Sequence, residues 1–203
     1  MNRCLRLMVV AFVSFFAGCG SSGEPLFGGF IPSGGSATIL APTNCNISFV
    51  GDAAIAGIVI DLTSYAESCD VIDATQLCGN KADSTRVLGL VLSGEVGGAS
   101  TDPVGAGTYR FQADPPSGVF TAAAGTAAQV DTLCQPQPGT SVAAMSGGSI
   151  TISSVTETRV TGTANMRFDD GQAFDQPFDV AVCQVTLDLC SRFLPCGSHD
   201  CVQ

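Results

Sequence analysis

Aromatic side chains and histidine are scarce, because the chain has no tryptophan, two tyrosines and one histidine. Extracellular carbohydrate-binding proteins often stack sugars on exposed rings, so this shortage disfavours that function. A Ser-His-Asp triad needs a histidine as its base. The single histidine, His199, has Asp200 beside it but lies between cysteines, and no G-x-S-x-G motif occurs. A surface histidine is therefore favoured over a catalytic one.

Several other catalytic and cofactor motifs are missing as well. There is no phosphate-binding glycine-rich loop, dinucleotide fingerprint or haem motif, and the single lysine, Lys81, has no S-x-x-K partner. The cysteines are too scattered for an iron–sulfur ligand set. We therefore expect no cofactor, and an enzyme is the least favoured class of function.

Positive charge is also scarce, with 8 lysines and arginines against 18 aspartates and glutamates. An acidic surface repels nucleic acid and anionic lipid headgroups, so the composition argues against DNA or RNA as a partner. For the same reason, any attachment to a membrane cannot come from a basic patch. The need to keep an exported protein soluble is enough to explain the acidity.

The first residues form a pattern typical of exported proteins. Arg3 and Arg6 precede the apolar run 7–18, which is too short to span a bilayer because spanning takes about 20 apolar residues. The run leads into the sequence FAGC at 16–19. This motif resembles the lipobox of bacterial lipoproteins, in which an aliphatic residue and two small residues precede a lipidated cysteine. Phe16 departs from the leucine that is commonest at its position.

This resemblance covers residues 1–19 and implies both export to the cell envelope and attachment to a membrane. A signal peptidase would remove residues 1–18, and Cys19 would carry diacylglycerol and a further fatty acid such as palmitate. One acyl chain binds a membrane only reversibly, whereas two or three attach a protein stably, because each buried methylene adds ~0.8 kcal/mol. Gly20 stands where aspartate often retains such proteins at the inner membrane, so the resemblance implies the outer membrane of a cell envelope.

Ten cysteines occur in the chain. Apart from Cys4 in the leader and Cys19, they form an even set, which predicts a disulfide framework in an oxidising compartment. The candidates for disulfide bonds are Cys45, Cys69, Cys78, Cys134, Cys183, Cys190, Cys196 and Cys201. The rival interpretation is a zinc knuckle formed by Cys190, Cys196, His199 and Cys201. Disulfides are favoured over zinc, because no C-x-x-C pair is present and export favours oxidation.

Two specific pairings can be suggested from the cysteine positions. Cys69 and Cys78 flank a short loop and could bridge locally. Cys45 and Cys183 border predicted strands and could join the ends of a sheet. The number of possible pairings of such a set is large, so both suggestions are hypotheses for the structure to test.

Glycine, serine and proline dominate residues 20–44, so a flexible tether is expected after the lipidated cysteine. Three apolar residues in this segment, Phe27, Phe30 and Ile31, could dock on the domain instead. The predicted organisation is a signal peptide at 1–18, a lipidated cysteine and tether at 19–44, and one domain with a cysteine-rich tail at 45–203.

The local pattern of the domain is that of β-strands. Short runs rich in β-branched and aromatic residues, bounded by turn residues, predict strands at 46–50, 55–62, 86–96, 107–111 and 118–121. Helical signal is weaker. The segments 64–77 and 122–133 could each be a short helix or a loop, and neither has clean caps.

The clearest pattern lies in the last third of the chain. Two alternating runs, 149–153 and 159–168, are separated by a turn, and a second turn at 169–171 leads to a third alternating run at 178–182. One face of the middle run carries Val160, Gly162, Ala164, Met166 and Phe168. Three such strands predict an antiparallel meander with one buried face.

The fold class that follows is all-β, an antiparallel β-sandwich or open barrel braced by disulfides. The run 146–183 also resembles the C-terminal half of uncharacterised lipoproteins from bacteria with elaborate envelopes. These share a Ser-Gly-Gly start, a Gly-Thr strand and a Phe-rich strand that ends in cysteine. That group mostly lacks an assigned activity, so the resemblance implies a fold and no chemistry.

Acidic residues gather at the second turn of the meander and in the strand after it. Asp169, Asp170 and Asp175 are a weak candidate for calcium, because they offer carboxylates but lack the D-x-D-x-D-G spacing. With Asp179, they could instead include a pair of glycosidase carboxylates. Asp-Asp-Gly is also an ordinary turn sequence, and a turn is the prediction.

The sequence therefore predicts a lipid-anchored envelope lipoprotein with a non-catalytic β domain. The alternatives are a barrel that binds a small ligand in its interior and, less favoured, an envelope hydrolase. The expected partner is the membrane, through the N-terminal lipid, together with an envelope protein or a small molecule.

Overall fold

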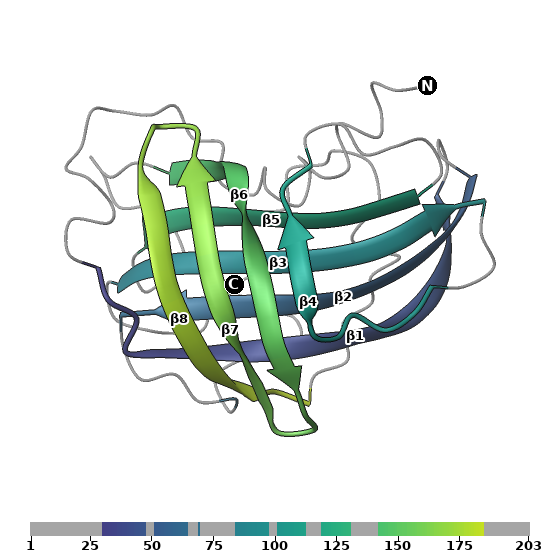
Figure 1. Ribbon diagram of the computed structural model, residues 1–203, viewed down its shortest axis with the longest axis horizontal. Helices are drawn as coiled ribbons and strands as arrows, with labels where there is room; N and C mark the ends of the chain where they lie inside the picture. Colours follow the sequence, from purple (N-terminus) through teal and green to yellow (C-terminus); the bar gives the residue numbers. More distant parts are fainter. Residues whose placement is uncertain are drawn as a thin grey trace.

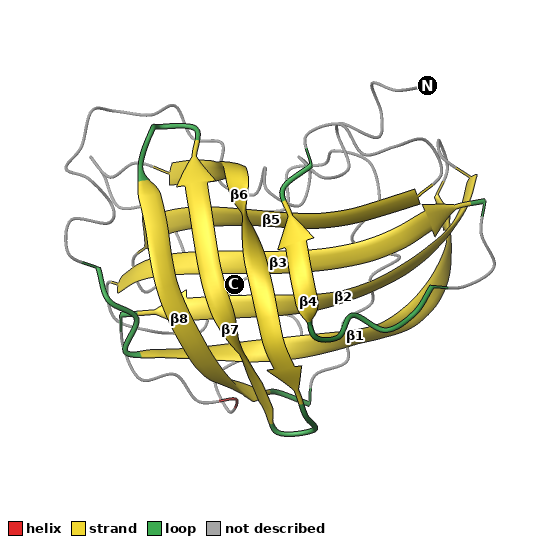
Figure 2. Ribbon diagram, in the orientation of Figure 1, coloured by secondary structure: helices red, strands yellow, loops and turns green. Residues whose placement is uncertain are grey.

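The computed structural model describes residues 30–47, 51–64, 69, 84–97, 101–112, 119–130 and 142–184. Within these residues the chain forms eight β-strands that belong to one sheet (Figures 1 and 2). The strands are β1 (Gly34–Ile47), β2 (Gly51–Thr63), β3 (Ser84–Val96), β4 (Gly107–Arg110), β5 (Val119–Val130), β6 (Val142–Val155), β7 (Arg159–Phe168) and β8 (Ala173–Val182). The all-β prediction is confirmed.

The sheet curls until it nearly closes into a barrel. Its strand order is β4-β6-β5-β3-β2-β1-β8-β7, and the second strand of this order, β6, also pairs with the last, β7. Among the described strands, every pairing is antiparallel except that of β1 with β8, which is parallel and matches Ser36 with Ala181 and Ala37 with Val182. The open-barrel prediction is thus confirmed, and the sheet is mixed because this one pairing, here called the closing seam, joins strands from opposite ends of the chain.

Two groups of strands cross each other in space. In Figure 1, β4, β6, β7 and β8 form a front layer that runs across a back layer of β1, β2, β3 and β5. Strand β6 belongs to both groups, since residues 142–144 pair with β5 while residues 149–152 pair with β4. Between these parts, Gly148 has a φ of 95° and the register with β7 shifts, so the strand turns where glycine permits it.

Buried apolar side chains from both layers fill the interior. Ile58 and Ile60 of the back layer belong to the same core cluster as Ile150, Met166 and Phe178 of the front layer. The predicted inward face of β7 is confirmed, because Val160, Gly162, Ala164, Met166 and Phe168 are all buried while the residues between them are more exposed. This burial of apolar surface is the main term that stabilises the barrel.

The back layer is buried on its outer face as well. Val59 and Leu90 lie opposite each other on that face, and Leu40 and Ile55 are buried with them. The same strand, β2, sends Ile58 and Ile60 inward. Because both faces of β2 are buried, apolar side chains are favoured at successive positions, which explains the nearly continuous apolar run of this strand.

One expectation about secondary structure is wrong. The segment 122–133, predicted as a helix or loop, is mostly strand, because β5 continues to Val130 and pairs along its length with β3. Its alanine-rich sequence has no alternation to reveal a strand. The other segment with weak helical signal, 64–77, lies almost entirely outside the described residues.

The flexible tether predicted for 19–44 is too long. Residues 34–44 belong to β1, which pairs with β2 on one side and β8 on the other. The docking suggested for Phe30 is confirmed, since its ring packs on Phe174 with the ring centroids 5.8 Å apart. Ile31 does not dock and is 71% exposed. Phe27 lies outside the described residues.

Candidate interaction surface

The outer face of the front layer carries polar side chains that pair with each other across strands. The hydroxyl groups of Thr108 on β4 and Thr151 on β6 lie 3.1 Å apart. On the next pair of strands, Asn165 donates from Nδ2 to Oδ2 of Asp175 at 3.1 Å. Cross-strand pairs of this kind each contribute roughly 0.2–1 kcal/mol to a sheet. The face therefore stabilises the meander and remains polar and exposed.

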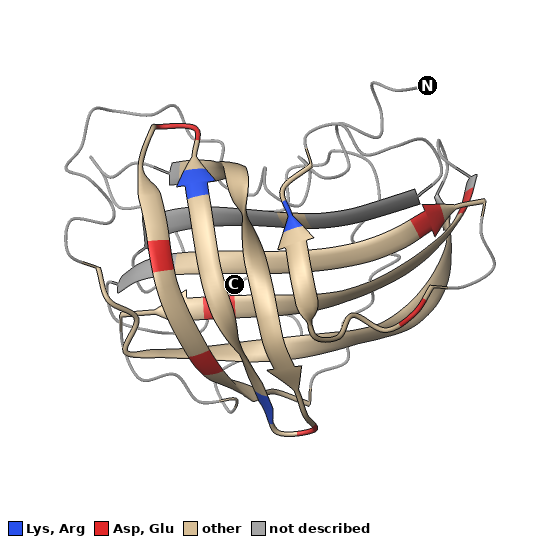
Figure 3. Ribbon diagram, viewed as in Figure 1, with Lys and Arg blue, Asp and Glu red and all other residues tan. Residues whose placement is uncertain are grey.

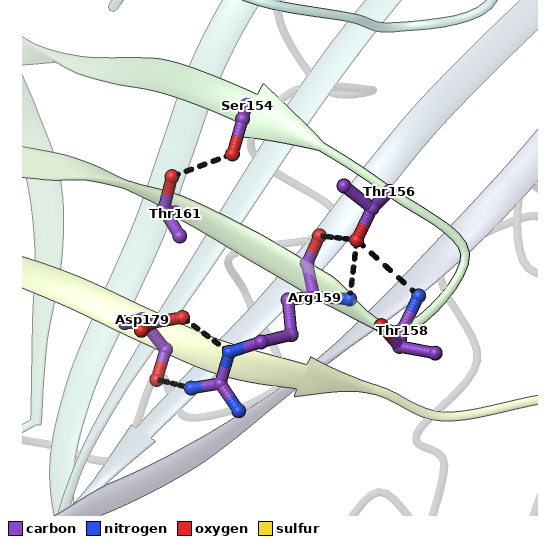
Figure 4. A network of polar contacts seen from close by, with 6 residues as sticks. All are labelled: Ser154, Thr156, Thr158, Arg159, Thr161 and Asp179. Atoms are coloured by element: carbon purple, nitrogen blue, oxygen red, sulfur yellow. Dashed lines mark hydrogen bonds and ion pairs between the residues drawn. The ribbon is translucent and has the colours of Figure 1, made fainter.

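Another polar network surrounds the turn between β6 and β7 (Figure 4). Ser154 and Thr161 share a hydrogen bond of 2.8 Å, and Nε of Arg159 lies 2.6 Å from Oδ1 of Asp179. Arg159 also donates to the carbonyl oxygen of Asp179 at 3.1 Å. The hydrogen bond and the charge of Asp179 raise the pKa of Arg159 above its usual value. Because both side chains are more than half exposed, this is a surface ion pair with a small effect on stability.

Thr156 holds that turn together through its hydroxyl group. The N–H of Arg159 donates to Thr156 Oγ1 at 2.9 Å, and the hydroxyl donates to the carbonyl oxygen of Arg159 at 3.1 Å. We expect Thr156→Ala to lower the free energy of unfolding by about 1 kcal/mol, as for loss of a typical hydrogen bond. Urea denaturation would measure this change. Thr158→Ala, in the same exposed turn, is the control, and an equal loss in both variants would contradict the role given to Thr156.

The acidic residues predicted at the β7–β8 turn do form a turn. Asp169 accepts from the N–H of Ala144 at 3.1 Å, and Asp170 accepts from the N–H of Gln172 at 3.0 Å. Asp175, on the strand β8 that follows the turn, accepts a hydrogen bond from Asn165 of β7. Within the described part of the chain, no three acidic, histidine or cysteine side chains form a group that could hold a metal ion. The calcium candidate therefore gains no support, since Asp169, Asp170 and Asp175 serve the turn and the sheet.

Two of these carboxylates, on Asp175 and Asp179, are too far apart to act as a glycosidase pair. Asp175 and Asp179 lie on one face of β8, four residues apart, which corresponds to about 13 Å along a strand. Glycosidase carboxylates are held roughly 5–9.5 Å apart. Asp179 is moreover paired with Arg159. Figure 3 shows the described acidic residues spread over strands and turns of the molecule.

The structure revises the predicted disulfide pairing. Cys69 is bonded to Cys183, with their Cα atoms 5.1 Å apart, so the suggested Cys69–Cys78 and Cys45–Cys183 bonds are both wrong. Cys45 is also disulfide-bonded. Sequence spacing favoured a local bridge, whereas the barrel brings the end of β8 close to a residue that follows β2.

The remaining site residues lie outside the described part of the chain. They are Cys19 and its lipobox, Lys81, His199, Asp200 and the cysteines Cys78, Cys134, Cys190, Cys196 and Cys201. Among the residues that are described, there is no helix of the length and hydrophobicity that crossing a membrane requires.

Comparisons with known proteins give no family for the chain. No protein-family model, curated protein or solved structure matches it. The properties of the surface therefore have to be judged from the residues themselves.

The exposure of one apolar side chain was not predicted from the sequence. Of the large hydrophobic side chains whose surroundings are described, Ile31 alone is exposed. The sequence suggested docking for Phe30 and Ile31 alike, whereas the structure packs the ring of Phe30 on Phe174 and leaves Ile31 in solvent.

Proposed function

We propose that the protein is a lipid-anchored lipoprotein of the bacterial cell envelope, with a non-catalytic β domain that acts through its surface. The observation that carries the proposal is the FAGC motif at 16–19, which follows a short apolar run and two arginines. The attached lipid would supply the membrane affinity that the acidic chain lacks.

The described domain supports this function in two ways. Its disulfide bond between Cys69 and Cys183 suits an oxidising compartment outside the cytoplasm. Buried apolar side chains, among them Ile58, Met166 and Phe178, form one core inside the barrel, which favours a role at the surface over a ligand held inside the barrel.

The proposal predicts that Cys19→Ser abolishes lipidation. In a bacterial host, the unchanged chain should incorporate labelled palmitate and remain with the membranes, whereas the variant should carry no label and appear in the soluble fraction. Gel fluorography and fractionation of lysed cells would measure both. Cys4→Ser is the matched control, because Cys4 lies in the segment that is removed, and it should behave as the unchanged chain does. Equal labelling of the Cys19→Ser protein would refute the proposal.

A further inference from the structure

Two contacts hold the segment around Ile31 against the barrel. The ring of Phe30 packs on Phe174 of β8, and Phe30 lies against the hydrophobic core. Three residues later, the N–H of Ser33 donates to the carbonyl oxygen of Thr63 at 2.9 Å. Ile31 lies between these contacts, so its exposed position belongs to a segment held on both sides.

Few residues separate this segment from the proposed lipid. Eleven residues lead from Cys19 to Phe30. Even fully extended, they would reach no more than about 36–40 Å. A domain of this size has a radius of gyration of about 15 Å. The lipid would therefore keep the edge that carries Phe30 and Ile31 nearer to the bilayer than most of the domain.

From this geometry we propose that the Phe30–Ile31 edge rests on the bilayer that holds the lipid, with the Ile31 side chain in the headgroup region. The inference depends on the proposed function, because it takes Cys19 as the attachment point. An exposed isoleucine gains free energy when it leaves water, and the anchor removes most of the entropic cost of bringing it to the surface. The contact is therefore expected only in the anchored protein.

Charge limits the depth of this contact. Asp169 and Asp170 are exposed in the turn that leads into β8, the strand of Phe174. Anionic headgroups would repel these carboxylates. The Phe30–Ile31 edge is therefore expected to contact a bilayer surface rich in zwitterionic lipid, at the depth of the headgroups.

The lack of tryptophan in the chain makes a direct test possible, because one introduced tryptophan supplies the whole tryptophan signal. The lipidated Ile31→Trp protein would be reconstituted into phosphatidylcholine vesicles with bromine on the acyl chains near the headgroups. Bromine quenches tryptophan at close range. We expect fluorescence at least twofold lower than in unbrominated vesicles, together with a blue shift of the emission.

The matched control is Thr163→Trp, at an exposed position in the middle of β7. It should show emission typical of water and no quenching by bromine. The unlipidated Cys19→Ser, Ile31→Trp protein should also be unquenched at the same lipid concentration.

Each other outcome has a definite meaning. If the lipidated Ile31→Trp protein floats with the vesicles but is unquenched, or if Thr163→Trp is quenched equally, the orientation is wrong and the lipid anchor stands. If the unchanged chain carries no palmitate and does not float with the vesicles, the proposed function fails, and the orientation fails with it.

Discussion

A protein that carries Cys69→Ala and Cys183→Ala together should be less stable than the unchanged protein by about 3–5 kcal/mol. The disulfide bond joins residues 114 positions apart, and closing a loop of that length restricts the unfolded chain strongly. Urea denaturation of the domain, with the lipid site replaced by serine for solubility, would measure the loss.

The location of the bond adds a local effect. Cys183 follows the closing seam directly, and its N–H donates to the carbonyl oxygen of Ala37 at 2.7 Å. The seam matches few residues, whereas β8 pairs with β7 along nearly its whole length. Without the disulfide, we expect faster hydrogen exchange at the amides of residues 182 and 183 than in the centre of the β7–β8 pairing.

Single substitutions provide the control for this prediction. Cys69→Ala and Cys183→Ala each remove the same bond. Each substitution alone should therefore lower the free energy of unfolding nearly as much as both together. Costs that simply add would show that the two side chains act separately. Unchanged stability in the double variant would show that the crosslink does not restrict the unfolded chain.

The second large effect is expected at Gly162, which lies inward on β7 between Ile152 of β6 and Phe178 of β8. A Cβ atom at this position would collide with the backbone oxygen of Thr151 and with the ring of Phe178. Gly162→Ala should therefore lower the free energy of unfolding by roughly 1–3 kcal/mol, and Gly162→Val by more, because overpacking a filled core forces its neighbours to move.

A matched alanine substitution separates collision from loss of glycine. Gly105 has no heavy atom within 4 Å of the place where its Cβ would stand, so Gly105→Ala should change stability little. Phe178→Leu should recover part of the loss in the Gly162→Ala protein, because a smaller side chain relieves one of the two collisions. Denaturation midpoints of the unchanged protein, of Gly162→Ala, of Phe178→Leu and of the double variant would show this coupling. Equal effects of Gly162→Ala and Gly105→Ala would contradict the collision.

Predictability from the sequence differs between strands for physical reasons. The bounds of β7 were predicted as the structure has them, since one face of this strand is buried, the other meets water, and strict alternation results. Only the start of β5 was predicted, within the strand expected at 118–121, because the small residues that continue it carry no alternation. The first part of β1 was missed because its residues 34–44 begin within a glycine-rich and serine-rich region that favours a tether.

The predictions for the candidate sites follow the same division. The turn at Asp169 and Asp170 could be predicted, because turn chemistry is local and depends on neighbouring residues. The partner of Cys69 could not be predicted, because it depends on how β8 returns to β1. The exposure of Ile31 was missed for a similar reason, since it depends on where Phe174 places the ring of Phe30.

The parallel pairing of β1 with β8 also determines when, during synthesis of the chain, the sheet can close. A chain that emerges N-terminus first delivers β1 early and its partner late, since Ser36 meets Ala181 and Ala37 meets Val182. Until then, that edge of β1 remains open to incorrect pairing with other chains. Contacts between residues so distant in sequence slow folding. The newly made protein should therefore depend on holding chaperones during the interval, and truncation before residue 181 should produce aggregates.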